Sequence, residues 1–288
     1  MDLTYLRENP DTIDRLLEHQ RIRTTTVHVG VGGRAERLTL DDGTNLFAKT
    51  REDAPDDFFR VEAQCLDWLR EAKATLIPEV IAATTNTLLL PWIEPADPTA
   101  PVAEKFGRDL AALHQAGASS FGAPWPGYIG SLTQDNTPAE QWAPFYAEQR
   151  CRPYVRQARD AGLFTREECA EVDQLLDRVP ALAGPAEPPS RLHGDLWSGN
   201  VHYAADGHVW LIDAAAHGGH RETDLAQLTV FGAPFLDRII AAYNEVSPLA
   251  DGWRDRLPLH ELQLLLVNAV LFGATYAARA LNNVRALA

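Results

Sequence analysis

Cysteine is scarce in this sequence of 288 residues, which contains only Cys65, Cys151 and Cys169. Their number is odd, they lie far apart, and no two of them form a Cys-x-x-Cys pair. This pattern argues against a disulfide framework and against a zinc site. We therefore expect three free thiols and a reducing, cytoplasmic compartment.

Positive charge is also scarce. Lys and Arg number 26 against 40 Asp and Glu, which gives a net charge of −14 at pH 7. Nucleic acids and anionic membranes bind clustered basic residues, so we expect neither as a partner. A cationic or amine-bearing substrate is compatible with this charge, and so is an acidic surface that serves solubility alone.

Long apolar runs are missing as well. Residues 2–20 contain charged side chains and Pro10, which predicts a packing helix instead of a signal peptide. The longest uncharged stretch, between Glu261 and Arg279, is short and holds polar residues, which predicts a buried helix and no membrane span. With 45% hydrophobic and 23% charged residues, the chain has the composition of one large or two modest folded domains.

The sequence does contain a phosphoryl-transfer pattern in residues 191–213. Four residues separate Asp195 of a His-Gly-Asp triplet from Asn200, and a predicted β-hairpin then leads to Asp213. This spacing is typical of a kinase catalytic loop followed by a second metal-binding carboxylate. Asp195 is the predicted catalytic base, and Asn200 and Asp213 are the predicted Mg²⁺ ligands. Alternatively these are ordinary turn and strand-end residues, which requires a coincidence of spacing.

At this loop the sequence resembles the fructosamine kinase (ketosamine-3-kinase) family, a branch of the group that includes aminoglycoside phosphotransferases and choline kinase. The simpler phosphotransferases share the His-Gly-Asp triplet and the Asn, whereas Leu196-Trp197-Ser198-Gly199 is a narrower signal. The resemblance extends over nearly the whole chain, with further matches at residues 128–132, 147–153, 219–226 and 242–245.

The first part of the sequence contains the elements of a nucleotide site. Two runs typical of β-strands, at residues 24–29 and 35–41, flank a cluster that includes Gly30, Gly32 and Gly33. Glycines let backbone N–H groups approach phosphate closely, but the same pattern is common in a simple hairpin turn. Both interpretations remain open from the sequence.

A lysine and a glutamate are expected to pair beside this loop. Leu46-Phe47-Ala48-Lys49 resembles the strand that presents a lysine to nucleotide phosphates in kinases. A helix is predicted over residues 56–71, and Glu62 lies on its apolar stripe, where a carboxylate is costly unless it is paired. We therefore predict an ion pair between Lys49 and Glu62; the alternative is two exposed surface residues.

A strongly apolar strand at residues 87–93 leads into a proline-rich segment, which predicts a hinge between two lobes. The resemblance implies that Pro91, Trp92 and Ile93 form the adenine edge of this hinge. Proline lacks an N–H, so the Pro91 carbonyl and the Ile93 N–H are the expected contacts.

Three residues are assigned to the acceptor pocket. The resemblance implies that Trp197 lines it, although an indole that plugs the floor of the lobe is the alternative. His217 and Glu222 are assigned to the same pocket, although ion pairs of Arg221, Glu222 and Asp224 that tie the turn after Asp213 to the following helix are the favoured interpretation of Glu222. The spacing of His217 and His220 also permits metal binding, but the sequence shows no third ligand nearby. Residues 214–216 are three alanines where relatives carry proline and aromatic residues.

The resemblance implies a two-lobed α+β fold of the protein-kinase type. Residues 1–93 form the N-terminal lobe, with an antiparallel sheet and one key helix, and residues 94–288 form a mostly helical lobe with the catalytic loop and acceptor pocket. ATP and Mg²⁺ are expected between the lobes. The implied reaction phosphorylates the 3-hydroxyl of a ketosamine, such as ribulosamine or fructosamine on a small amine or a protein lysine, and so serves deglycation. The spacing alone yields ATP, Mg²⁺ and a hydroxyl acceptor.

Other functions remain open from the sequence. An aminoglycoside, choline or another amino alcohol is an alternative acceptor for the same chemistry. A nucleotide-binding pseudokinase without turnover is a second alternative, but it predicts the loss of Asp195, Asn200 or Asp213. A third, a metal-dependent hydrolase built on His193, His217 and His220, lacks a tight ligand cluster.

Overall fold

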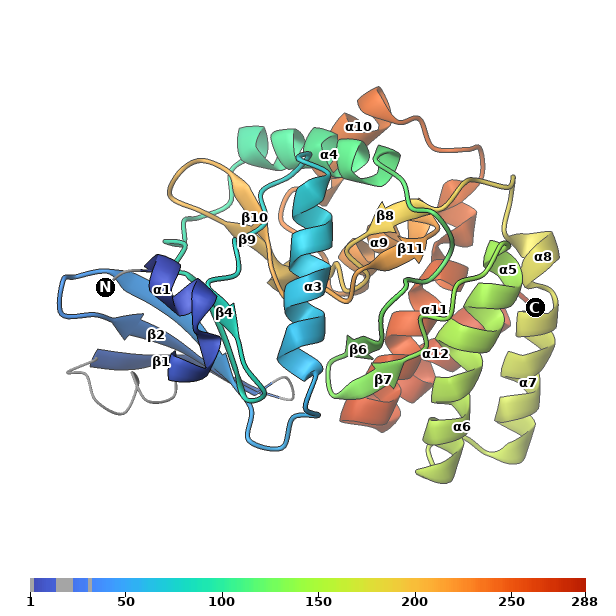
Figure 1. Cartoon of the computed structure of the whole chain (residues 1–288). Helices are drawn as coiled ribbons and strands as arrows, with labels where there is room; N and C mark the ends of the chain where they lie inside the picture. Colours follow the sequence, from blue (N-terminus) through green and yellow to red (C-terminus); the bar gives the residue numbers. More distant parts are fainter. Residues whose placement is uncertain (1–2, 14–22, 31–32) are drawn as a thin grey trace.

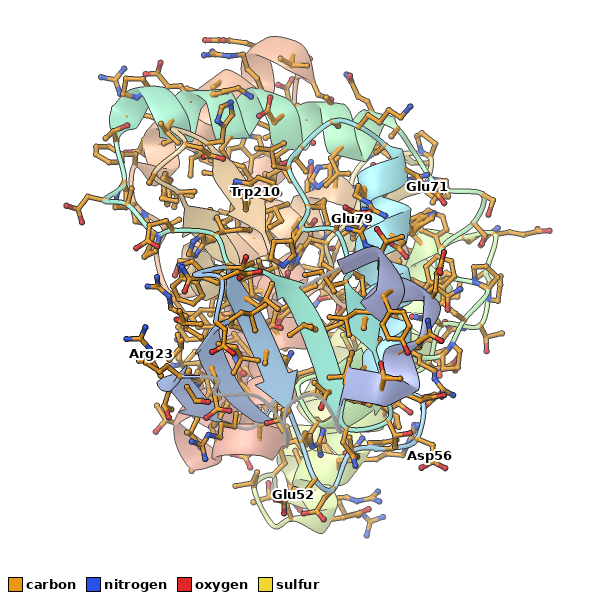
Figure 2. All side chains as sticks on the ribbon, turned by 60° about the vertical axis from the view of Figure 1, so that its left-hand side comes forward. Arg23, Glu52, Asp56, Glu71, Glu79 and Trp210 are labelled. Carbon is orange, nitrogen blue, oxygen red and sulfur yellow. The ribbon has the colours of Figure 1, made fainter. Side chains whose placement is uncertain are left out.

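The structure is a computed structural model that describes residues 3–13, 23–30 and 33–288 (Figure 1). Among these residues, no helix combines the length and the apolar character of a membrane span. Charged side chains of the sheet side project outward, as Figure 2 shows for Arg23, Glu52, Asp56, Glu71 and Glu79. All three cysteines are free thiols, as predicted.

The N-terminal part is built on one antiparallel sheet of five strands in the order β1-β2-β3-β5-β4. The strands are β1 (Arg23–Gly30), β2 (Gly33–Thr39), β3 (Asn45–Thr50), β4 (Ala82–Ala83) and β5 (Thr87–Pro91). Leu6 and Ile13 pack on apolar side chains of this sheet and form a separate small core. The strands predicted from residues 24–29, 35–41 and 87–93 are confirmed.

The helix predicted over residues 2–20 is wrong in its extent. The helix α1 (Leu3–Glu8) ends before Pro10, which begins the 3₁₀ turn η1 (Pro10–Thr12). Proline has no N–H to continue the helical hydrogen bonds, and it disfavours helical backbone at the residue before it. Residues 14–20 of the prediction lie outside the described part.

One helix joins the sheet to the rest of the molecule. Helix α3 (Phe58–Glu71) stands between them in Figure 1. Its buried residues Phe59 and Leu66 share one apolar core with Phe106 and Leu110 of α4 (Ala100–Gln115), while Glu62 on the same helix also is buried. The stripe predicted at helical spacing therefore holds α3 against the larger part and gives Glu62 a fixed position.

The remainder of the chain is mostly helical, as predicted. Its further helices are α5 (Trp142–Phe145), η2 (Tyr146–Cys151, a π-helical turn), α6 (Arg152–Asp160), α7 (Arg166–Asp177), α8 (Val179–Leu182), α9 (Arg221–Val230), α10 (Leu236–Val246), α11 (Trp253–Phe272) and α12 (Ala274–Ala286). The stretch between Glu261 and Arg279, predicted as one buried helix, belongs to two helices, because Gly273, with φ of 92°, separates α11 from α12. Only glycine adopts such a backbone without strain.

Three short two-stranded sheets complete the fold, and two of them carry the catalytic segment. They pair β6 (Gly127–Ile129) with β7 (Leu132–Gln134), β9 (Val201–Tyr203) with β10 (Val209–Leu211), and β8 (Ser190–Leu192) with β11 (His217–Gly219). Because β8 and β11 are antiparallel neighbours, the segment after β8 lies beside the segment before β11. Asp195 and Asp213 are therefore brought together from positions 18 residues apart.

Candidate active site

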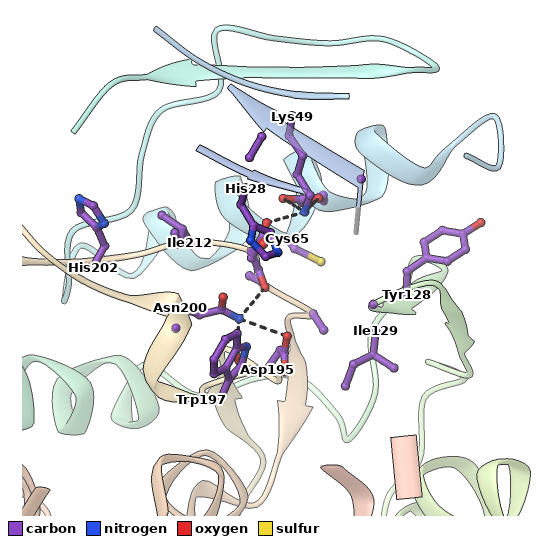
Figure 3. A pocket seen from close by; sticks show the side chains of 18 of the residues that line it. His28, Lys49, Cys65, Tyr128, Ile129, Asp195, Trp197, Asn200, His202 and Ile212 are labelled. Atoms are coloured by element: carbon purple, nitrogen blue, oxygen red, sulfur yellow. Dashed lines mark hydrogen bonds and ion pairs between the residues drawn. The ribbon is translucent and has the colours of Figure 1, made fainter. Parts of the chain in front are cut away.

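A cavity of about 670 Å³ contains most of the predicted site residues. Lys49 and Gly33 line it from the sheet, and Asp195, Asn200 and Asp213 line it from the catalytic segment (Figure 3). The structure therefore brings the two predicted halves of the site to opposite walls of one space.

Asn200 is the centre of the catalytic segment. Its Nδ2 donates to the Asp195 carbonyl oxygen at 2.8 Å and to Asp195 Oδ2 at 3.1 Å, and lies 3.5 Å from the Asp213 carbonyl oxygen. The short turn η3 (Ser198–Asn200) returns the chain so that this amide reaches back to Asp195. Because the Asn200 nitrogen is occupied by these hydrogen bonds, its Oδ1 atom is left to serve as a metal ligand or a hydrogen-bond acceptor in the cavity wall.

Asp213 has an unusual backbone conformation, with φ of 58°. For a residue other than glycine this left-handed conformation costs about 1 kcal/mol or more and is concentrated at functional sites. It turns the chain after β10 and leaves the Asp213 side chain 43% exposed in the cavity. A strand that simply ended here would not need this conformation.

The predicted ion pair between Lys49 and Glu62 is present. Lys49 Nζ lies 3.2 Å from Glu62 Oε1 and 2.9 Å from Oε2, and both side chains are buried. Lys49 Nζ also lies 2.5 Å from Asp213 Oδ1, so one ammonium connects the sheet, helix α3 and the catalytic segment.

Burial and charge act in opposite directions on this triad. Burial would lower the pKa of Lys49, but the carboxylates of Asp213 and Glu62 outweigh it and raise that pKa. Burial would raise the pKa of Asp213, but the Lys49 ammonium has the larger effect, and the pKa lies below its usual value. Burial raises the pKa of Glu62, and the adjacent Lys49 ammonium opposes this rise and favours the ionised carboxylate of the pair. Lys49 is thus charged and Asp213 is ionised at neutral pH.

The pKa of Asp195 is raised to about 7, first by burial and then by the negative charge of Asp213, while the Asn200 hydrogen bond opposes the shift. A general base is most effective when its pKa lies near the working pH. The environment of Asp195 thus suits it to accept a proton from a hydroxyl group.

Helix α9 holds the catalytic loop through side chains that bind its backbone. Asp224, fully buried, accepts the N–H groups of His193 at 2.8 Å and Gly194 at 3.0 Å. Gln227 accepts the Leu196 N–H at 2.6 Å and donates to the Gly194 carbonyl at 3.1 Å. The sequence predicted Asp224 only as an ion-pairing residue, and no sequence signal identified Gln227.

His193 and Gly194 fix the loop against the segment that carries Asp213. His193 Nε2 donates to the Ile212 carbonyl at 2.9 Å, which leaves Nδ1 to accept the Asp195 N–H at 3.3 Å. A Cβ atom at Gly194 would lie 2.2 Å from the Ala215 carbonyl oxygen, so only glycine fits there. The two segments approach each other as closely as their backbones allow.

The hinge offers two backbone groups to the cavity. The Trp92 N–H donates to the Asn45 carbonyl of the sheet at 3.3 Å. The Pro91 C=O belongs to the same planar peptide unit, so it points away from the sheet. The next N–H, that of Ile93, donates to no group in the described part of the chain, and Pro91, Trp92 and Ile93 all line the cavity. The missing N–H of Pro91 removes no contact with β3.

Two glycines of the predicted cluster are described, and they pair with each other where β1 ends and β2 begins: Gly30 and Gly33. Gly33 lines the cavity, has φ of 116°, and has no room for a Cβ, which would lie 2.3 Å from the Thr50 carbonyl oxygen. Gly32 lies outside the described residues. A hairpin turn and a cavity wall are thus combined in one segment, and its contact with phosphate stays a prediction.

Trp197 lies at the cavity and is 37% exposed, so the alternative of a buried plug is wrong. A Cβ at Gly199 would lie 2.1 Å from the indole ring. Glycine at this position therefore lets the indole lie across the loop, which gives a physical reason for the Trp-Ser-Gly sequence.

The structure does not support direct substrate contact by His217 and Glu222. They are 2% and 0% exposed and do not line the cavity. His217 Nδ1 donates to the Ala215 carbonyl at 2.9 Å, and its Nε2 accepts from the buried Arg150 at 3.3 Å. Burial and then the charge of Arg150 lower the pKa of His217 to about 3. His217 is therefore a neutral structural residue behind the catalytic segment.

Glu222 belongs to a second buried cluster. Arg256 donates two hydrogen bonds to its carboxylate, of 2.8 and 2.5 Å, as an ion-pairing role predicts. His220 and His260 place ring nitrogens within 4.8 Å of the same carboxylate, which supplies the third ligand that the sequence did not reveal. However, the guanidinium already neutralises Glu222. Of the three histidines of the hydrolase alternative, only His220 belongs to this cluster of described residues, so His193, His217 and His220 do not form one metal centre.

A buried Lys and Glu pair on one wall, two carboxylates with an amide on the other, and a free hinge backbone define the catalytic cleft of a kinase-like phosphotransferase. The family model of fructosamine kinase matches residues 11–288. The chain therefore belongs to the fructosamine kinase family, whose members use ATP, and it is a phosphotransferase that acts on a hydroxyl group. The sequence resemblance is confirmed.

Individual relatives agree with this assignment. A probable ketoamine kinase of Vibrio parahaemolyticus is 33% identical over 279 residues, which cover 93% of each chain. A probable ketoamine kinase of Enterococcus faecium is also 33% identical and covers 81% of this chain and 84% of its own. The crystal structure of a candidate fructosamine-3-kinase from Thermobifida fusca superimposes with a TM-score of 0.89, at 47% identity over 95% of this chain and 97% of its own.

More distant structures show the fold alone. An aminoglycoside phosphotransferase in complex with a nucleotide analogue and hygromycin B has a TM-score of 0.65 at 16% identity, and it covers 96% of this chain and 98% of its own. The predicted two-lobed α+β fold of the protein-kinase type is confirmed.

Proposed function

We propose that this protein transfers the γ-phosphoryl group of ATP to the 3-hydroxyl of a ketosamine, such as ribulosamine or fructosamine, and so serves deglycation. The relatives named as ketoamine and fructosamine kinases support the acceptor class. The observation that carries the chemistry is Asp195, with its raised pKa, beside Asn200 and Asp213 and opposite Lys49.

The nucleotide has a complete set of partners in this proposal. Lys49, held by Glu62, binds the α- and β-phosphates, and the hairpin with Gly30, Gly32 and Gly33 covers them. At the hinge, the Pro91 carbonyl accepts from the adenine amino group, the Ile93 N–H donates to the ring, and Trp92 forms the edge between them. Residues 1–93 act as the nucleotide lobe and residues 94–288 as the acceptor lobe.

The donor set of the cleft fits Mg²⁺. Asn200 Oδ1 and the half-exposed Asp213 carboxylate are hard oxygen ligands, which Mg²⁺ prefers. When bound, the ion neutralises charge on the transferred phosphoryl group and on the phosphates beside it. Asp213 then has a second cation besides Lys49.

Asp195 orients the acceptor hydroxyl and receives its proton as the oxygen attacks. Its carboxylate accepts one hydrogen bond from Asn200 through Oδ2, and the residue lines the cavity. Asp224 and Gln227 hold the backbone on both sides of it, so the carboxylate keeps its place when the nucleotide binds. Trp197 forms the near wall of the acceptor pocket.

The proposal is tested by incubating the protein with Mg-ATP and one acceptor at a time. The panel comprises ribulosamine, fructosamine, a fructosylated lysine peptide, an aminoglycoside and choline, and the readout is ADP. We expect turnover with ketosamines, assignment of the phosphate to the 3-hydroxyl by NMR, and near loss of turnover in Asp195→Ala. Turnover of only the aminoglycoside or choline contradicts the proposed acceptor, and no turnover with any acceptor supports a pseudokinase instead.

A further inference from the structure

One face of α11 lines the cleft beyond the catalytic segment. Its cavity-lining residues recur at intervals of one, three and four positions, which places them on one helical face: Leu264, Val267, Asn268, Leu271 and Phe272. All but Asn268 are apolar. A single amide in an apolar stripe needs a physical reason, because the position is otherwise suited to leucine.

Asn268 has no partner in the described protein. Its side chain is 6% exposed, and its Nδ2 is buried without a hydrogen bond. Leaving a buried amide unpaired is unfavourable by about 1–3 kcal/mol. By contrast, the neighbouring Gln263 is 1% exposed and donates to Gln134 Oε1 at 3.3 Å. The fold thus satisfies one amide of α11 internally and leaves the other for the cavity.

Four aromatic rings continue from the catalytic loop along this side of the cavity. The ring of Phe231 lies 5.5 Å from that of Trp197 and 6.1 Å from that of Tyr276, which in turn lies 5.9 Å from that of Phe272. Trp197, Phe231 and Phe272 are 37%, 40% and 56% exposed, so large apolar surface stands open at the cavity. We call these four residues the aromatic row.

The carboxylates that line the cavity come from α3 and from the catalytic segment. Among the described residues, its carboxylates are Glu62, Asp195 and Asp213, and each already has the contacts described above. The side formed by α11 and the aromatic row contributes none. A ligand with several ammonium groups would therefore find no carboxylate there to replace its hydration.

We propose that Asn268 hydrogen-bonds a hydroxyl of the acceptor sugar and that the aromatic row contacts its amine-borne part. An amide offers both a donor and an acceptor, which matches a hydroxyl group. The aromatic faces bind an apolar or aromatic substituent and one adjacent ammonium. The enzyme then prefers ketosamines of apolar or aromatic amines to polycationic acceptors. This specificity rests on the proposed function.

The role of Asn268 is tested with Asn268→Leu. We expect the KM for a ketosamine to rise about three- to tenfold, because a neutral hydrogen bond is lost, while the KM for ATP stays the same. Thermal stability should stay equal or rise, because an unpaired amide is removed from an apolar site. Gln263→Leu on the same helix should instead lower Tm, because it removes the hydrogen bond to the buried Gln134 Oε1. An unchanged ketosamine KM, or a Tm loss equal to that of Gln263→Leu, overturns the assignment.

The aromatic row is tested with two fructosamines that share the sugar, one made from benzylamine and one from ethylenediamine. We expect kcat/KM to be at least tenfold higher for the benzylamine compound, and Phe231→Ala or Tyr276→Ala to remove most of this ratio. Phe235→Ala serves as the control, since Phe235 is 44% exposed but does not line the cavity. Equal kcat/KM for both compounds would refute the proposed contact between the aromatic row and the amine-borne part. Turnover of neither, with an aminoglycoside accepted, refutes the proposed function itself.

Discussion

Asp195 combines two properties that are separate in most carboxylates: it is ordered by a hydrogen bond to Asn200, and its pKa is raised to about 7. A base must be unprotonated to accept a proton. We therefore expect kcat/KM to fall about tenfold per pH unit below about pH 7. Asp195→Asn should lower kcat by about 10²- to 10⁴-fold at all pH values. A flat profile between pH 5 and 8 in steady-state assays would contradict the proposed base.

The same raised pKa predicts that stability falls with rising pH, whereas activity rises. Between the unfolded pKa of 3.8 and the folded value of about 7, the folded protein holds a proton on Asp195 that the unfolded chain has lost. Stability from this group is therefore complete below about pH 4 and is lost as the pH rises through 7. Without nucleotide or metal, Asp195→Asn should raise Tm at pH 8 and leave it nearly unchanged at pH 4. Calorimetry that finds a lower Tm at pH 8 would refute the burial of this charge.

Lys49 forms ion pairs with both Glu62 and Asp213. Lys49→Met removes the cation while it keeps the length of the side chain. We expect kcat/KM for ATP to fall about 10²-fold, because a positioned charge on the phosphates is lost. Lys105→Met is the control, since Lys105 pairs only with Asp109 on the surface of α4. Nucleotide titration and steady-state kinetics measure both, and an unaltered KM for ATP would place the phosphates elsewhere.

At the scale of single residues, the sequence predicts those active-site residues that follow a fixed motif spacing or place a charge where burial is unfavourable. Asp195 and Asn200 follow from the loop spacing, and Glu62 from a charge on an apolar stripe. Asn268 was missed because one amide in a long helix has many explanations until its lack of a partner is visible. Glu222 was misplaced because sequence proximity to Asp213 does not show which way α9 turns its side chains.

Helix α9 does not line the cavity, but its side chains hold the backbone of the catalytic loop. Its Asp224 accepts two N–H groups of the loop and also contacts His114 at 3.2 Å. Asp224→Asn turns one acceptor oxygen into a donor that faces another donor. We expect a loss of about 2–4 kcal/mol in the free energy of unfolding, together with a lower kcat. The same substitution at Asp237, exposed at the start of α10, should change unfolding by less than about 0.5 kcal/mol.

Urea unfolding of both variants measures this difference. If Asp224→Asn and Asp237→Asn lose equal stability, the loop is not held by α9. At this scale the sequence predicts most helices and strands, since apolar periodicity follows from local chemistry. It does not predict the pairing of β8 with β11, because that contact joins segments 25 residues apart through glycines that have no hydrophobic pattern.

For the whole molecule, two features explain why nucleotide binding should be linked to stability. The sheet has its own small core with α1, while α3 belongs to the larger core, and Lys49 connects the two across the cleft. The sequence predicts the pair of Lys49 and Glu62, but it does not predict the division into two cores, since that depends on how distant segments pack. A ligand held by both walls therefore adds contacts that the free protein lacks.

We expect Mg-ATP at 100 times its Kd to stabilise the folded state by about 2.7 kcal/mol, which corresponds to a Tm increase of roughly 5–10 °C for a chain of this size. Chelation with EDTA should remove a large part of this increase, because the metal joins the phosphates to Asp213 and Asn200. Asp213→Asn should lower the increase in the same way and make it insensitive to EDTA. Differential scanning fluorimetry measures the Tm increase of the unmodified protein and of Asp213→Asn, each with and without EDTA. An increase that is equal with and without EDTA in the unmodified protein would mean that these two residues do not hold a metal with the nucleotide.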